Sequence, residues 1–88
     1  MRFIIRHYDD GFSKANRELF GGAPQEAISA VEALRNLGVV ELRDHQQVDT
    51  RDWQVADTGD GCAIATHPDY PAQTLEAEGF DEYAKQDA

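Results

Sequence analysis

Apolar and polar residues alternate at the start of the chain, which predicts a strand over residues 2–8. Phe3, Ile5 and His7 would lie on one face, and Arg2, Ile4, Arg6 and Tyr8 on the other. Asp9-Asp10-Gly11 supplies turn chemistry at the end of this strand. A short helix from Ser13 to about Phe20 is expected next, with Gly21-Gly22 as its stop.

The clearest helical pattern lies in the segment that opens at Ala23-Pro24. Pro24 suits a first helical turn, and apolar residues recur at helical spacing as Ala27, Ile28, Val31 and Leu34. Asn36-Leu37-Gly38 is expected to end this helix, because Gly38 can adopt a left-handed conformation.

The second half of the chain favours strands separated by turns. A strand is predicted from Val39 to about Asp44, then a polar loop over residues 45–52, then a hairpin that pairs residues 53–56 with 62–66 across a glycine-containing turn. His67–Pro71 breaks the pattern, and residues 72–78 and 80–85 are expected to be a short helix and a last turn. The order β-α-α-β-β-β-α predicts an α+β fold, with about four mainly antiparallel strands and helices on one face.

Length and composition narrow the class of protein. The 88 residues predict a single domain, residues 1–88, and 17 acidic against 8 basic residues give a formal net charge of -9.

No apolar run is long enough for a membrane span or a signal peptide, and the lone Cys62 cannot form an internal disulfide, so we expect a cytoplasmic protein. The negative charge argues against direct nucleic-acid binding. The negative charge is instead compatible with a basic partner protein, with a role in solubility alone, or with a halophilic source.

The negative charge is concentrated in the last quarter of the chain. Residues 67–88 carry a net charge of -5, whereas residues 1–22 carry +1. Acidic residues there interleave with Leu75, Phe80 and Tyr83, which favours a carboxylate array with aromatic anchors that docks on a basic surface, although a purely solvated face is the alternative. The predicted partner-binding residues are Glu76, Glu78, Asp81, Glu82 and Tyr83.

Signatures of catalysis are short and lack their usual context. Asp57-Thr58-Gly59 matches three residues of the aspartic protease signature, but Asp60 follows where that family has a small residue. The residues after Asp60 supply no calcium ligands, and Cys62 is expected to be a buried structural thiol. We therefore predict no catalytic residue, metal or cofactor. A small enzyme that uses Asp57, Asp60, Cys62 and His67 remains the alternative.

In its size, acidity, α+β layout, excess of arginine over lysine and alanine-rich helix, the chain resembles phage-encoded anti-CRISPR proteins that inhibit type I surveillance complexes. That resemblance implies an inhibitor that blocks a host nucleic-acid-binding complex by occupying its basic surface. The group shares no motif, so no residue role carries over. A structural module of a halophile or phage is a further alternative, and the unpaired edges of an open sheet allow either a monomer or a homodimer.

Overall fold

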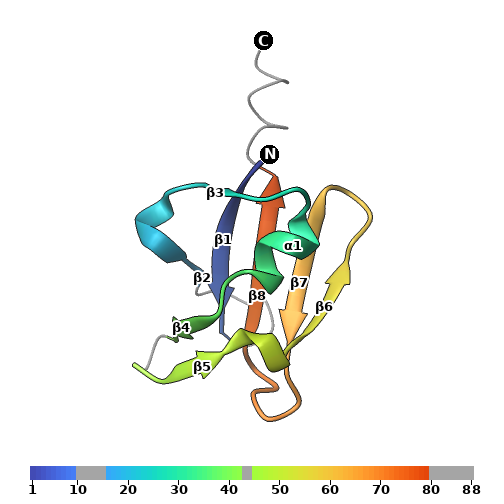
Figure 1. Cartoon of the computed structure of the whole chain (residues 1–88). Helices are drawn as coiled ribbons and strands as arrows, with labels where there is room; N and C mark the ends of the chain where they lie inside the picture. The colour runs from blue at the N-terminus through green and yellow to red at the C-terminus, as the bar shows by residue number, and fades with distance from the viewer. Residues whose placement is uncertain (10–15, 43–44, 80–88) are drawn as a thin grey trace.

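Over the residues that the structure describes, the fold is an antiparallel sheet with one short helix and a small hairpin packed on the same face. The computed structural model describes residues 1–9, 16–42 and 45–79 (Figure 1). Its strands are β1 (Arg2–Tyr8), β2 (Asn16–Glu18), β3 (Gln25–Glu26), β4 (Val39–Glu41), β5 (Gln47–Asp49), β6 (Gln54–Asp57), β7 (Cys62–Thr66) and β8 (Thr74–Gly79). Its helices are α1 (Ala30–Arg35) and the 3-10 turns η1 (Leu19–Gly22) and η2 (Thr50–Asp52).

The main sheet has the strand order β2-β1-β8-β7-β6, and β3 pairs with β1 beside β2. The first and last described strands are therefore neighbours at its centre, with Ile5 opposite Ala77. A separate two-stranded sheet, β4-β5, lies with α1 in front of the main sheet in Figure 1. Strands hold 46% of the described residues. The predicted α+β fold with packed helices is thus wrong, and the protein is mostly β.

Two segments that were expected to be helical are strands or turns instead. Residues 72–78 were predicted to be helical because Leu, Glu and Ala favour helices, but β8 lies between β1 and β7 and is a central strand. The expected helix from Ser13 to Phe20 is wrong over the described residues, because Asn16–Glu18 pair with β1 and Leu19–Gly22 form a 3-10 turn. The last turn over residues 80–85 lies outside the described residues.

The predicted central helix is much shorter than its periodicity suggested. Gln25–Glu26 pair with β1 as β3, and the Ala27 amide donates to the Met1 carbonyl at 2.9 Å, which holds this segment extended. The helix begins only at Ala30, because the Ser29 hydroxyl caps it by accepting a hydrogen bond from the Glu32 amide at 3.1 Å. Gly38 follows the helix with φ +71°, which confirms its predicted left-handed conformation.

The strand and hairpin predictions of the second half are confirmed with small changes. β6 pairs with β7 as the expected antiparallel hairpin, with Gln54 opposite Thr66, and the turn between them contains Gly59 and Gly61 at positive φ. Val39 to Glu41 forms a strand as predicted, but the expected loop over residues 45–52 contains its partner β5 and the turn η2.

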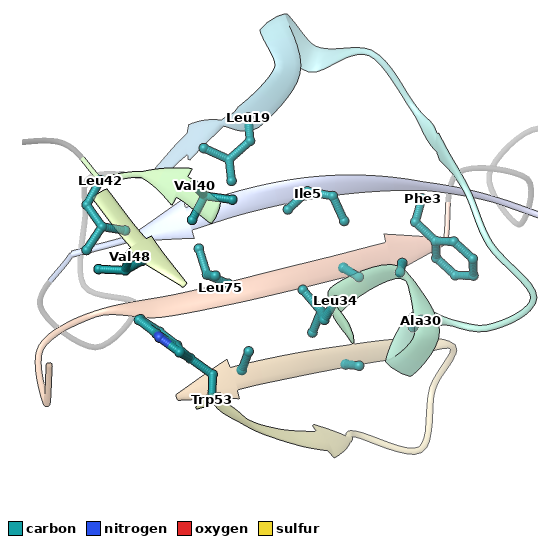
Figure 2. Packing of buried hydrophobic residues seen from close by; sticks show 14 residues of the cluster. Phe3, Ile5, Leu19, Ala30, Leu34, Val40, Leu42, Val48, Trp53 and Leu75 are labelled. Atoms are coloured by element: carbon teal, nitrogen blue, oxygen red, sulfur yellow. The ribbon is translucent and has the colours of Figure 1, made fainter. Parts of the chain in front are cut away.

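The core lies between the main sheet and the elements that cover it. β1 contributes Phe3 and Ile5, and β8 contributes Leu75, which is fully buried (Figure 2). On β7 the buried residues are Ala63 and Ala65, because α1 packs closely on this strand and leaves room only for small side chains. Cys62, which was expected to be a buried structural thiol, lies with Ile64 on the opposite face.

Trp53 is 6% exposed and belongs to the core. Its ring stacks on Tyr70, with the centroids 5.7 Å apart and the planes 12° apart, and it also lies 5.9 Å from His67. None of the helices in the described residues has the length and apolar composition that a membrane crossing requires.

Candidate functional site

A cluster of charged side chains occupies the face of the main sheet opposite α1. It consists of Arg6 and Tyr8 on β1, Glu18 on β2, and Glu76 and Glu78 on β8, and we call it the charged face. Phe3, Ile5 and His7 point into the core, so the alternate residues of β1 point the other way. Strand register places Glu18 and Glu76 on either side of Arg6.

Arg6 lies at the centre of the charged face and interacts with three carboxylates. Its Nη1 donates to Glu78 Oε1 at 2.9 Å and lies 3.6 Å from Glu76 Oε1, and its Nη2 lies 3.6 Å from Glu18 Oε2. Burial alone would lower the pKa of Arg6, but its hydrogen bond to Glu78 and the nearby negative charges raise the pKa above its ordinary value. Three carboxylates against one guanidinium leave the cluster with a net negative charge.

Tyr8 extends the network along β1. Its hydroxyl donates to Glu76 Oε1 at 3.0 Å. Burial raises the pKa of Tyr8, and the hydrogen bond to the Glu76 carboxylate raises it further, because ionising the phenol would remove the donor and place two negative charges together. The side chains of Arg6, Glu76 and Glu78 are only 18–25% exposed, so this network is held in place rather than freely solvated.

Replacing Glu76 with glutamine is expected to lower the pKa of Tyr8 towards its ordinary value of 10.0, because the variant removes the adjacent negative charge. A raised folded-state pKa means that stability from Tyr8 is complete below about pH 10 and is lost as the pH rises through the folded value. The Glu76→Gln protein should therefore lose less stability at alkaline pH than the wild type. Ultraviolet titration of the phenols and melting curves measure both effects. Glu18→Gln is the control and should change neither, and an unchanged Tyr8 titration in Glu76→Gln would contradict the network.

The structure places only part of the predicted partner-binding set. Glu76 and Glu78 lie on the charged face, but on a half-buried strand rather than on a solvated helix. Leu75, which was expected to interleave with them as an apolar contact, is fully buried in the core. Asp81, Glu82 and Tyr83 lie outside the described residues.

The charged face includes three residues that sequence reasoning did not assign to a site, namely Arg6, Tyr8 and Glu18. The alternation in residues 2–8 already placed Arg6 and Tyr8 on the polar face of a strand. Nothing in the local pattern indicated that this strand pairs with one some 70 positions later, as the 72-residue separation of Arg6 and Glu78 requires.

The residues of the alternative enzyme site are brought together only in part, because Asp60 lies beside Cys62 but His67 lies apart from them. Asp57 ends β6 and Asp60 lies in the turn that follows, whereas His67 follows the opposite end of β7, about 16 Å away along an extended strand. His67 Nδ1 accepts a hydrogen bond from the Asp69 amide at 3.0 Å. Within the described ranges, no three His, Cys, Asp or Glu side chains are grouped so that they could hold a metal ion.

Cys62 is half-buried beside Glu78 on the sheet. Burial raises the pKa of its thiol, and the negative charges of Asp60, Glu78 and Glu76 raise it further. A raised pKa keeps the sulfur protonated near neutral pH, which opposes the thiolate form that a nucleophile needs.

Comparison of the chain with protein-family models, with curated proteins and with solved structures finds no match.

Proposed function

We propose that this protein acts by binding rather than by catalysis, and that it inhibits a host nucleic-acid-binding complex by occupying its basic surface, as the anti-CRISPR resemblance implies. The observation that carries the proposal is the charged face, where Glu18, Glu76 and Glu78 surround a single arginine. The negative charge left over on this face complements lysine and arginine residues that otherwise contact phosphates.

The geometry of β8 supports this role. Glu76 and Glu78 are two residues apart on one strand, so their attachment points repeat at about 6.7 Å along an extended backbone. Hydrogen bonds from Arg6 and Tyr8 hold these carboxylates in place before a partner arrives. Preorganised groups lose less conformational entropy on binding than free side chains do, which favours affinity.

The chemistry of the candidate enzyme residues also favours binding. The pKa of the Cys62 thiol is shifted in the direction that suppresses a nucleophile. The pKa of Asp60 is lowered, chiefly by the hydrogen bond from Thr58, so this carboxylate is a weaker base than an ordinary aspartate.

Capture of the partner by the immobilised protein tests the proposal. The wild type should retain a nucleic-acid-binding complex from a host lysate, identified by mass spectrometry, and retention should fall as salt is raised. The double variant Glu76→Gln and Glu78→Gln keeps side-chain size but removes two charges, and should weaken capture by about ten-fold or more, or about 1.4 kcal/mol.

A matched control removes two charges elsewhere. Asp57→Asn and Asp60→Asn change exposed carboxylates on the β6–β7 turn to amides that can still accept hydrogen bonds. This variant should bind as the wild type does, and melting curves should show that both doubles fold. Equal capture by the wild type and the Glu76/Glu78 variant, or capture of a partner that binds no nucleic acid, would contradict the proposal.

A further inference from the structure

A groove lies between the edge of the main sheet and the β4–β5 hairpin. It has a volume of about 360 Å³, and its walls come from β2 and η1 on one side and from β4 on the other. Figure 2 shows Leu19 and Val40 pointing toward one another in the core, and both also line the groove. Its complete lining is Arg17, Glu18, Leu19, Phe20, Gly21, Val39, Val40 and Glu41.

Two large apolar side chains in the groove wall are exposed to solvent. Phe20 is 48% exposed and Val39 is 61% exposed. Phe20 also has φ +56°, a left-handed conformation that is rare for a bulky residue. Strained backbone at a surface position is often retained because it serves a binding site, and here it holds an aromatic ring at the groove.

The groove-side edge of β4 pairs with no strand of the described residues, although one of its carbonyls, that of Glu41, accepts a hydrogen bond from Arg17. The Gly38 carbonyl and the Leu42 amide bond toward the β5 strand, so the alternate residues Val39 and Glu41 direct their backbone groups away from it. In the described part of the chain, β4 pairs with β5 alone. Such an edge can accept another extended strand.

Arg17 provides a donor at the same place. Its Nη2 donates to the outward-facing Glu41 carbonyl at 2.6 Å, which links β2 to β4. Its Nε is buried and has no hydrogen-bond partner, a costly state for a charged group.

The charges of the groove favour a bound segment that carries basic residues. Glu18 and Glu41 are among its lining residues, and the side chain of each is half-exposed. We propose that this groove binds an extended segment of the partner protein, in which apolar residues contact Phe20 and Val39, basic residues face the rim and the backbone pairs with β4. This inference rests on the proposed function for the identity of the partner as a basic protein, and it adds a second contact with it.

Titration with a synthetic peptide tests the groove without the natural partner. The probe is acetyl-Lys-Val-Lys-Val-Lys-Val-amide, and binding is followed through the backbone amide signals of the ¹⁵N-labelled protein. We expect saturable shifts at Leu19, Val39 and Glu41. An acidic twin with Glu in place of Lys, and an analogue N-methylated at alternate residues, should not bind, because they lack the charge and the pairing amides.

Three variants locate the contact. Phe20→Gly removes the ring and suits the positive φ, and Val39→Lys adds a repelling charge at an exposed position. Each should raise the dissociation constant of the basic peptide by about ten-fold. Ile28→Ala, at a residue 82% exposed outside the groove, is the control and should leave it unchanged.

Several outcomes would overturn the inference. The first is that the N-methylated analogue binds as tightly as the basic peptide. The second is that the amide shifts are confined to the charged face or are absent at millimolar peptide. The third is that the groove shifts depend on protein concentration alone, which would indicate binding of a second copy. The Glu76→Gln and Glu78→Gln protein should still bind the peptide in the groove. Failure of the groove is thereby distinguished from failure of the charged face.

Discussion

Replacing Leu75 with alanine is expected to lower the free energy of unfolding by about 2–5 kcal/mol and the melting temperature by about 10 °C or more. Leu75 lies on β8 at the centre of the sheet, is 0% exposed and is flanked by His7 on β1 and Ala65 on β7. The variant leaves a cavity among close-packed neighbours that belong to three strands. Since a domain of this size has a total stability of about 5–10 kcal/mol, much of the margin would be lost.

Val39→Ala is the control for this prediction. Val39 is 61% exposed, so its truncation should change the free energy of unfolding by less than about 0.5 kcal/mol. Thermal and denaturant melts of both variants make the comparison. If Leu75→Ala melted like Val39→Ala, residues 74–79 could not form the central strand, and the topology would be wrong.

Replacing Arg6 with methionine is expected to lower the free energy of unfolding by about 2–4 kcal/mol at neutral pH. The variant keeps an unbranched side chain of similar length but leaves Glu18, Glu76 and Glu78 without their shared cation. Two of these carboxylates are mostly buried, so solvent screens their mutual repulsion only in part. The loss should shrink below about pH 4, where carboxylates take up protons.

Rescue separates this charge effect from lost packing. Adding Glu76→Gln and Glu78→Gln to Arg6→Met should restore most of the stability, because the amides carry no charge. Arg35→Met is the matched control: Arg35 is 61% exposed and lies 4.0 Å from Glu32, so its loss should cost under about 0.5 kcal/mol. Denaturant melts across pH measure all four proteins. An Arg6→Met protein as stable as Arg35→Met would show that the cluster is not coupled.

Local signals predicted the β6–β7 hairpin and the first strand of this protein. The β6–β7 hairpin follows from alternating residues around Gly59 and Gly61, and the first strand follows from Phe3 and Ile5. These elements are decided by neighbours along the chain, so their signals are present in short windows of sequence.

Long-range pairing accounts for the predictions that failed. Thr74–Gly79 contains strong helix formers, yet Leu75 and Ala77 alternate with Glu76 and Glu78, a period of two that fits a strand with one buried face. The pairing of β3 with β1 likewise holds residues that have helical spacing in an extended form. Tertiary contacts override propensity in both places, and no short window of sequence contains them.

The candidate site also combines a feature that the sequence predicted with one that depends on long-range pairing. Composition identified Glu76 and Glu78 as acidic residues of interest, because charge can be counted along the chain. The part played by Arg6, Tyr8 and Glu18 depends on strand register, which brings the first third of the chain beside the last described strand. The sequence therefore indicated a charge excess, whereas the structure shows how that charge is held.

Competition with nucleic acid tests the central claim most directly. The captured host complex is first loaded with its labelled target DNA, and this protein is then added while release of the label is followed. The wild type is expected to displace the DNA at low salt, and the Glu76→Gln and Glu78→Gln protein is expected to do so about ten-fold less effectively. A stable complex that holds both DNA and this protein would contradict the account, because the two would then occupy different surfaces.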